Sequence, residues 1–174
     1  RLSTEAKKHG TRLYVAMNRR FYSVIAQAKR ITETHGPLLG IEIHAPERIQ
    51  IVKNLGKFSQ QSIDHWLYLN SIHCIDLFRF FGGETAKIVG LRSRITEKNG
   101  DQFGSLIAFK NGAIGHYIAH WHSPGSWSVV LYTPRHRIVL DPLEHGRIDM
   151  IDHREKIAAS KTMKEDGLDR QYKP

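Results

Sequence analysis

Residues 62–83 read SIDHWLYLNSIHCIDLFRFFGG, and this stretch carries most of the information about the fold. The spacing predicts a helix over residues 62–81, with apolar side chains on nearly every face. A helix that is apolar all round is typical of a buried position. Gly82-Gly83 marks its end, because glycine tolerates the left-handed conformation that terminates many helices. We therefore expect a buried helix at the centre of the domain.

The polar residues of this helix fall on one side. Asn70, His73 and Asp76 follow one another at intervals of three, so at about 100° per residue they lie within about 120° of one another. A buried imidazole or carboxylate costs free energy unless it is paired. Asp76 can orient or charge His73, as in catalytic pairs, or it can pair with Arg79. Both a structural His–Asp pair and a catalytic site remain open at this point.

The segments before this helix contain signals for helices and strands. The pattern predicts a helix tail over 3–9 that ends at Gly10, a strand over 12–17, a helix over 19–35 with Asn18 as N-cap, a strand over 38–52 and a polar loop over 53–61.

The segments after the helix are strands with turn signals. We expect strands over 86–96, 103–110, 113–121, 127–133, 136–140 and 146–151, with hairpin turns at Asn99-Gly100 and Asn111-Gly112 and a charged tail over 152–174. Helices early and strands late indicate an α+β fold. The expected architecture is an open, mainly antiparallel β-sheet of about six strands with helices packed on one face.

Bulk composition places the chain among single globular domains. It has 174 residues, of which 40% are hydrophobic, and it contains no apolar run long enough for a transmembrane helix. The single cysteine, Cys74, favours a reducing, cytoplasmic setting. Its apolar neighbours predict an inert thiol, because burial raises a thiol pKa. The N-terminus resembles the body of a helix, and we expect both ends of the chain to be truncated.

The net charge of +9 suggests an anionic partner. The basic residues are scattered, however, and no segment combines them with stacking aromatic side chains in a nucleic-acid motif. A solvated basic surface is therefore favoured over a nucleic-acid-binding domain.

A second group of candidates is His116, His120 and His122. At strand periodicity all three point to one face, and two imidazoles two residues apart can share a metal. No cysteine or well-placed carboxylate completes such a site, so we expect no metal.

A third group is Asn18-Arg19-Arg20-Phe21, at the expected junction of a strand and a helix. A helix N-terminus binds anions well, and the alternative is an N-cap followed by solvated arginines. The chain contains neither G-x-G-x-x-G after a strand nor G-x-x-x-x-G-K-[ST], so it has no phosphate-binding loop of its own.

These motifs together resemble the glucose–fructose oxidoreductase / inositol dehydrogenase / MocA (Gfo/Idh/MocA) family, and the resemblance spans nearly the whole chain. It rests on Tyr14–Phe21 (YVAMNRRF), His73–Gly83 (HCIDLFRFFGG), Phe109–Ala113 (FKNGA) and Val139–Pro142 (VLDP), in that order. It implies a C-terminal domain like that of dihydrodipicolinate reductase over residues 18–174. Residues 1–17 would then be the end of an N-terminal Rossmann domain.

The resemblance also implies a function. The full-length protein would use NAD or NADP to oxidise or reduce a sugar-like molecule, whereas this chain would bind no cofactor and lacks the family's catalytic lysine. His73 would be catalytic, and Asn18, Arg19, Arg20, Asn70 and Asp76 would bind substrate. The sheet would form a homodimer or homotetramer interface.

One position departs from the family pattern. Many members carry an aspartate four residues before the histidine, where this chain has Leu69. Leucine can neither accept a proton nor bind a hydroxyl. Two alternatives to the enzyme therefore remain: a non-catalytic dimerisation module of the same fold, and a basic domain that binds anions or nucleic acid.

Overall fold

A computed structural model describes residues 2–97 and 100–157, and all strands among these residues belong to a single β-sheet. Its strands are β1 (Gly40–His44), β2 (Thr85–Ser93), β3 (Gln102–Phe109), β4 (Ile114–His120), β5 (Ser128–Tyr132), β6 (His136–Leu140), β7 (Gly146–Met150) and β8 (Arg154–Ile157). They follow the order β2-β3-β4-β1-β5-β6-β7-β8, and β1–β4 is the one parallel pair among them. The expected open, mainly antiparallel sheet is confirmed, with eight strands rather than about six.

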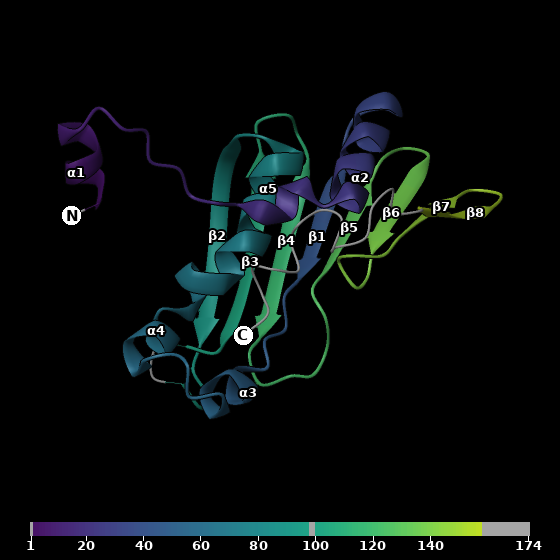
Figure 1. Ribbon diagram of the computed structural model, residues 1–174. Helices are drawn as coiled ribbons and strands as arrows, with labels where there is room; N and C mark the ends of the chain where they lie inside the picture. Colours follow the sequence, from purple (N-terminus) through teal and green to yellow (C-terminus); the bar gives the residue numbers. More distant parts are fainter. Residues whose placement is uncertain (1, 98–99, 158–174) are drawn as a thin grey trace.

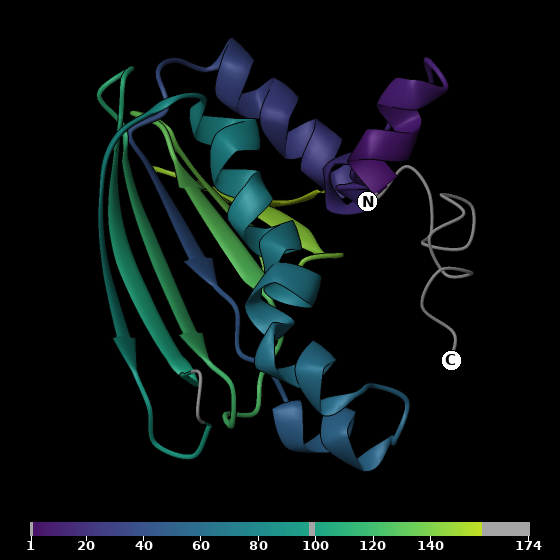
Figure 2. The same ribbon diagram turned by 90° about the vertical axis from the view of Figure 1, so that its left-hand side faces the viewer.

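The helical segments are α1 (Leu2–Lys8), the 3₁₀ turn η1 (Asn18–Phe21), α2 (Ser23–Thr34), α3 (Ile49–Asn54), α4 (Gln60–Asp64), the π-helical turn η2 (Leu67–Ser71) and α5 (Ile72–Gly82). α1 has no buried residue and stands apart from the sheet, as Figure 1 shows, whereas α2 and α5 cover one face of it. Figure 2 shows α2 and α5 along the same side of the sheet, with no helix on the other side. The two-layer α+β architecture is therefore confirmed. None of the described helices is long and apolar enough to cross a membrane.

The core lies between these two layers. Ile41 and Ile43 of β1, Leu77 of α5 and Ile25 of α2 are each at most 1% exposed. A Cβ added at Gly82 would lie 2.5 Å from the Phe109 ring, so this glycine lets the end of α5 approach the sheet closely.

The opposite face of the sheet is bare and largely apolar at one end. The register of β2, β3 and β4 sets Val89 beside Leu106, and Leu106 beside His116. Val89, Leu91, Leu106 and Ile114 are all more than half exposed. An exposed apolar surface of this kind is typical of an interaction site.

The segment before α2 differs from the prediction. The expected strand over 12–17 is wrong: it forms no ladder, and Leu13, Tyr14 and Val15 are exposed. Alternation of apolar residues predicts a strand only where a neighbouring strand supplies hydrogen bonds. The helix expected over 19–35 divides into η1 and α2, so Asn18 does not cap a long helix.

The strand expected over 38–52 is also partly wrong. Only Gly40–His44 is a strand, and residues 49–54 form α3 instead. Ile49 is buried whereas Ile51 is 52% exposed. Residues two apart point to different sides of a helix but to the same face of a strand, so this difference fits the helix. The loop expected over 53–61 ends early, because the Ser59 side chain accepts a hydrogen bond from the Ser62 N–H and caps α4.

The central helix exists, but it is not regular and not buried all round. Residues 62–64 belong to the separate helix α4, which ends at Asp64, and the π-helical η2 and α5 follow it as far as Gly82. Tyr68 and Leu69 are 72% and 48% exposed, because only the side toward the sheet is covered. The stop at Gly83 is confirmed by its φ of 79°.

The turn and tail predictions have mixed outcomes. Gly112 has a φ of 90°, and the Asn111 side chain accepts a hydrogen bond from the Ala113 N–H, which confirms that hairpin turn. Asn99 of the other turn and residues 158–174 of the tail lie outside the described residues. The described part of the tail contains β8, which the sequence did not predict.

Candidate functional site

The candidate site lies where η1 packs beside the polar side of α5, as Figure 1 shows. The two segments are more than fifty residues apart in the sequence. The tertiary structure therefore brings the Asn-Arg-Arg group and the polar residues of the central helix together, as the resemblance implied.

Arg20 and Asp76 form the strongest contact between these segments. Arg20 Nε and Nη2 each donate to one carboxylate oxygen of Asp76 at 2.5 Å. A bidentate pair of this kind fixes both side chains. It also settles the alternatives for Asp76: Arg79 pairs instead with Glu84 at 2.7 Å, and Asp76 makes no hydrogen bond to His73. Arg20 and Asp76 thus hold η1 on α5.

His73 has an imidazole that favours the neutral form. Burial and the positive charge of Arg19 lower its pKa, and the negative charge of Asp76 opposes this shift only in part. Its Nδ1 is buried and has no hydrogen-bond partner among the described residues. A structural His–Asp hydrogen bond, which the sequence left open, is therefore not formed. A neutral imidazole with an unpaired nitrogen is suited to accept a proton or a hydrogen bond.

Glu47 is a residue of the site that sequence reasoning missed. Its side chain is 6% exposed, and its carboxylate accepts hydrogen bonds from Asn70 Nδ2 at 3.0 and 3.1 Å and from Ser71 Oγ at 2.9 Å. Burial raises the pKa of Glu47, and the hydrogen bond from Ser71 opposes that rise. The carboxylate therefore fixes the orientation of the Asn70 amide.

A cavity of about 490 Å³ opens beside Glu47 and Asn70. Arg19 lies in its wall, and its guanidinium is 5.4 Å from the ring centre of Trp127 and 5.1 Å from that of Tyr22. The other lining residues are Pro46, Arg48, Ile51, Val52, Trp66, Gly125, Ser126, Leu143 and Glu144. Aromatic walls with a few fixed polar groups are typical of sites for sugar-sized molecules.

Only some of the predicted substrate residues reach this cavity. Arg19 and Asn70 line it, whereas Asn18, Arg20, His73 and Asp76 do not. Asn18 is 6% exposed and begins η1, a turn of four residues whose N-cap is Met17. A turn this short has little helix dipole, so the helix N-terminus offers little support for the anion site that the sequence left open.

The three histidines of the second group do not share one site. His116 and His120 lie on the bare face of the sheet, but His122 follows the end of β4. His122 Nε2 is 3.3 Å from Glu97 Oε1 instead. No group of His, Cys, Asp and Glu side chains within 2–97 and 100–157 is placed to hold a metal ion.

Cys74 is fully buried, and burial raises its pKa well above the ordinary value. The thiol therefore stays protonated, which confirms the prediction that it is unreactive.

No protein-family model matches the chain, and neither does any curated protein. Several solved structures match with high TM-scores. UDP-N-acetylglucosamine 3-dehydrogenase from Acidithiobacillus ferrooxidans is 15% identical, with a TM-score of 0.74 over 95% of this chain and 53% of the other. An oxidoreductase from Agrobacterium radiobacter, in complex with NAD⁺, L-tartaric acid and magnesium, is 16% identical, with a TM-score of 0.72 over 98% and 56%.

Levoglucosan dehydrogenase, in complex with NADH and L-sorbose, is 20% identical, with a TM-score of 0.70 over 91% of this chain and 50% of the other. The chain therefore spans about half the length of these structures. At such identities the likeness establishes the fold alone, and the resemblance derived from the motifs is confirmed at that level.

Proposed function

We propose that this chain is the C-terminal, substrate-binding and oligomerisation domain of a NAD(P)-dependent Gfo/Idh/MocA oxidoreductase. The parent enzyme acts on a sugar, a nucleotide sugar or a polyol. The fold shared with nucleotide-sugar and levoglucosan dehydrogenases supports the class of reaction. The observation that carries the proposal is His73, whose imidazole favours the neutral form and has a buried nitrogen without a hydrogen-bond partner among the described residues. His73 follows Asn70, which lines the cavity, by three residues on the same helical segment.

His73 is the proposed catalytic residue of this domain. Its imidazole accepts the proton of a substrate hydroxyl, and the lowered pKa keeps it ready to do so at neutral pH. Arg19 and Asn70 hold other polar groups of the substrate, and Glu47 orients Asn70. Arg20 and Asp76 are assigned a positioning role, because they bind each other.

The nicotinamide cofactor is assigned to the remainder of the parent protein, where it supplies the acceptor for the substrate's hydride. The described residues do not fit a dinucleotide, since their one parallel strand pair, β1–β4, is not followed by a glycine-rich turn into a helix. Residues 1–174 alone should therefore show no measurable affinity for NAD or NADP. Micromolar binding to this chain would overturn the domain assignment.

The test is activity of the parent protein with NAD and NADP on levoglucosan, L-sorbose and UDP-N-acetylglucosamine, followed by absorbance of the reduced cofactor. We expect His73→Gln to lower kcat/KM by about 10²- to 10⁴-fold at an unchanged melting temperature. Ile75→Ala is the matched control, because it changes the opposite side of the same helix. Equal activity of the two variants would remove His73 from the reaction.

A second candidate is a non-catalytic assembly module of the same fold. Leu69, which is 48% exposed, supplies no polar group where many family members have an aspartate. The bare sheet face with Val89, Leu91 and Leu106 favours the assembly role in either case. A parent that assembles normally but turns over no substrate with either cofactor would favour this candidate.

The proposed homodimer or homotetramer uses the bare face of the sheet. Leu106→Glu places a charge among apolar side chains and should convert the assembly to monomers in analytical ultracentrifugation. Leu55→Glu, which makes the same change at a half-exposed leucine at the end of α3 and away from this face, is the control and should leave the assembly unchanged. The parent is assigned to the cytoplasm, where the single buried thiol of Cys74 would remain reduced.

A further inference from the structure

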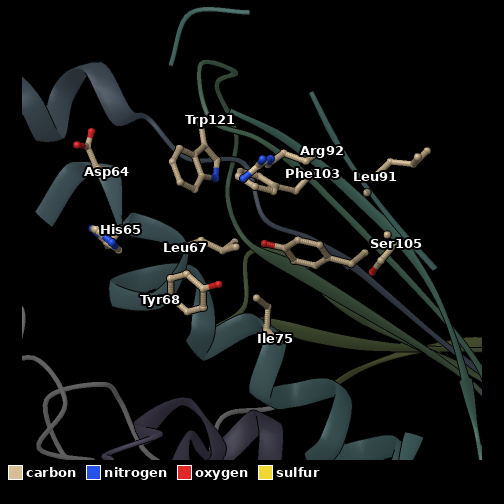
Figure 3. A pocket seen from close by; sticks show the side chains of 13 residues that line it. Asp64, His65, Leu67, Tyr68, Ile75, Leu91, Arg92, Phe103, Ser105 and Trp121 are labelled. Atoms are coloured by element: carbon tan, nitrogen blue, oxygen red, sulfur yellow. The ribbon is translucent and has the colours of Figure 1, made fainter. Parts of the chain in front are cut away.

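A second cavity, of about 510 Å³, lies on the other side of α5 from His73. It separates the segment from α4 to α5 from strands β2 and β3, and Figure 3 shows its lining. Ile75 and His73 are two residues apart on α5, so they point in nearly opposite directions. The cavity is therefore not part of the site described above.

The lining of this cavity is mainly apolar and aromatic. Leu67, Tyr68 and Ile75 contribute from the helical side, and Phe103 and Trp121 from the sheet side. The rings of Phe103 and Trp121 lie 4.9 Å apart, centre to centre. A volume of this size, lined in this way, suits a flat ligand with one or two rings.

One end of the cavity carries two hydrogen-bond donors for which the described residues supply no acceptor. Trp121 is 3% exposed, and its Nε1 is buried with no hydrogen-bond partner among the described residues. Figure 3 shows that this nitrogen is on the side of the indole that faces Arg92. A buried N–H without an acceptor costs free energy, so an acceptor in the cavity would be stabilised there.

Arg92 supplies the positive charge at the same end. No carboxylate of residues 2–97 and 100–157 pairs with it. Its side-chain stem packs against Gly100, where an added Cβ would lie 2.7 Å from it, so the guanidinium is held near the indole. Register pairs Arg92 with Phe103 on the helix-covered face of the sheet, which directs the side chain toward the cavity.

The remaining polar groups of the lining do not oppose an anion at this end. Asp64 accepts a hydrogen bond from Gln60 at 2.8 Å, and Figure 3 shows its carboxylate directed away from the cavity. The Nδ1 of His65 lies 2.8 Å from the carbonyl oxygen of Gln61, which leaves Nε2 free to meet a ligand hydroxyl.

We propose that this cavity is a second ligand site, which binds a small aromatic carboxylate. One carboxylate oxygen accepts from the Trp121 indole N–H, and the other pairs with the Arg92 guanidinium. The ring of the ligand lies between Phe103 on the sheet and Ile75 on the helix. Neither donor belongs to the proposed catalytic group, so the site is independent of His73.

Isothermal titration calorimetry of the full chain with 1-naphthoate tests the proposal, with neutral 1-naphthalenemethanol as the matched probe. We expect naphthoate to bind at least tenfold more tightly than the alcohol, because charge-assisted hydrogen bonds to a carboxylate are the stronger kind. Equal affinities, or no binding of either probe, would overturn the proposal.

Three variants locate the bound probe. Arg92→Gln should weaken naphthoate binding by about tenfold or more, and Trp121→Phe by about threefold to tenfold. Gly90→Leu should abolish binding, because a Cβ at Gly90 meets no atom closer than 3.9 Å and the added side chain fills the cavity. Arg135→Gln, which removes the same charge from an exposed turn, is the control.

Two results would contradict the assignment. Equal weakening of naphthoate binding by Arg92→Gln and Arg135→Gln would show that the charge of Arg92 has no specific role. Retention of binding in Gly90→Leu would show that the probe occupies another surface, such as the bare face of the sheet.

Discussion

The two sides of α5 differ in how their polar groups are satisfied. On the side toward η1, Arg20 binds Asp76, and Glu47 binds Asn70 and Ser71, so nearly every charge has a partner within the fold. On the side toward β2, Trp121 Nε1 and Arg92 have none among the described residues. Charged residues in a cleft can therefore bind one another and stabilise the fold. Donors that lack acceptors in an apolar cavity are instead the feature on which we base the proposed ligand site.

The largest expected effect concerns the face of α5 that packs on the sheet, between the two sides compared above. Leu77 is fully buried between α5 and the sheet, so Leu77→Ala should lower the free energy of unfolding by about 2–5 kcal/mol. Chemical denaturation measures this loss. An effect below about 1 kcal/mol would show that α5 packs loosely, and the distinction between its two sides would then have no fixed scaffold.

The next effect tests whether the η1 side is held by charge pairing. Arg20→Ala leaves Asp76 without its partner, and the Asp76 side chain is only 12% exposed. The free energy of unfolding should fall by about 2 kcal/mol, between the values for surface and buried pairs. The double variant Arg20→Met/Asp76→Leu should recover part of that loss, since it removes both charges together. A single variant as stable as the native chain would contradict the positioning role.

The pH dependence of Glu47→Gln examines the same side more finely. Because burial raises the pKa of Glu47 in the folded chain, the folded state holds a proton that the unfolded state releases above about pH 4.5. The native chain therefore loses stability relative to Glu47→Gln as the pH rises from about 4.5 toward the raised pKa of Glu47 in the folded chain. Denaturation of both proteins between pH 4 and 8 measures the free energy of unfolding of the native chain minus that of Glu47→Gln, and this difference should fall as the pH rises. A difference that stays constant would mean that Glu47 is not desolvated.

The smallest effect is expected on the β2 side. Ile75 is 39% exposed and borders an open cavity, so Ile75→Ala should cost less than about 1 kcal/mol of unfolding free energy. A loss as large as that of Leu77→Ala would show that the cavity is filled by packing. The comparison between the two sides would then fail.

The architecture could be predicted from the sequence more completely than the site. Residues 85–150 carry alternation and turn signals, such as Asn111-Gly112, that act locally, and their strands were predicted nearly to the residue. Ile49 and Ile51 suggested a strand because two alternating residues fit a strand and a single helical turn equally well. The pairing of β1 with its two neighbouring strands ends at His44, which leaves residues 49–54 to form a helix, and no local pattern shows where that pairing stops.

The site depended on contacts that no local pattern reveals. Glu47 lies between a proline and an arginine in the sequence, and its role comes from Asn70, 23 residues away. The sequence offered His73 and Arg79 as partners for Asp76, whereas the structure pairs it with Arg20, 56 residues away. The residue types were therefore recognisable, whereas their pairing required the tertiary structure.

The π-helical turn Leu67–Ser71 determines the direction, about the helix axis, in which the residues just before it point. Such a turn holds one residue more than a regular α-helical turn, and it rotates the preceding segment by about 100° about the helix axis. Trp66, at its start, is 6% exposed and faces the Glu47 cavity through that rotation. Deletion of a single residue within the turn would restore a regular α-helix and swing the indole out of the cavity wall. The presence or absence of one residue in this turn therefore determines which side chains of the preceding segment line the cavity.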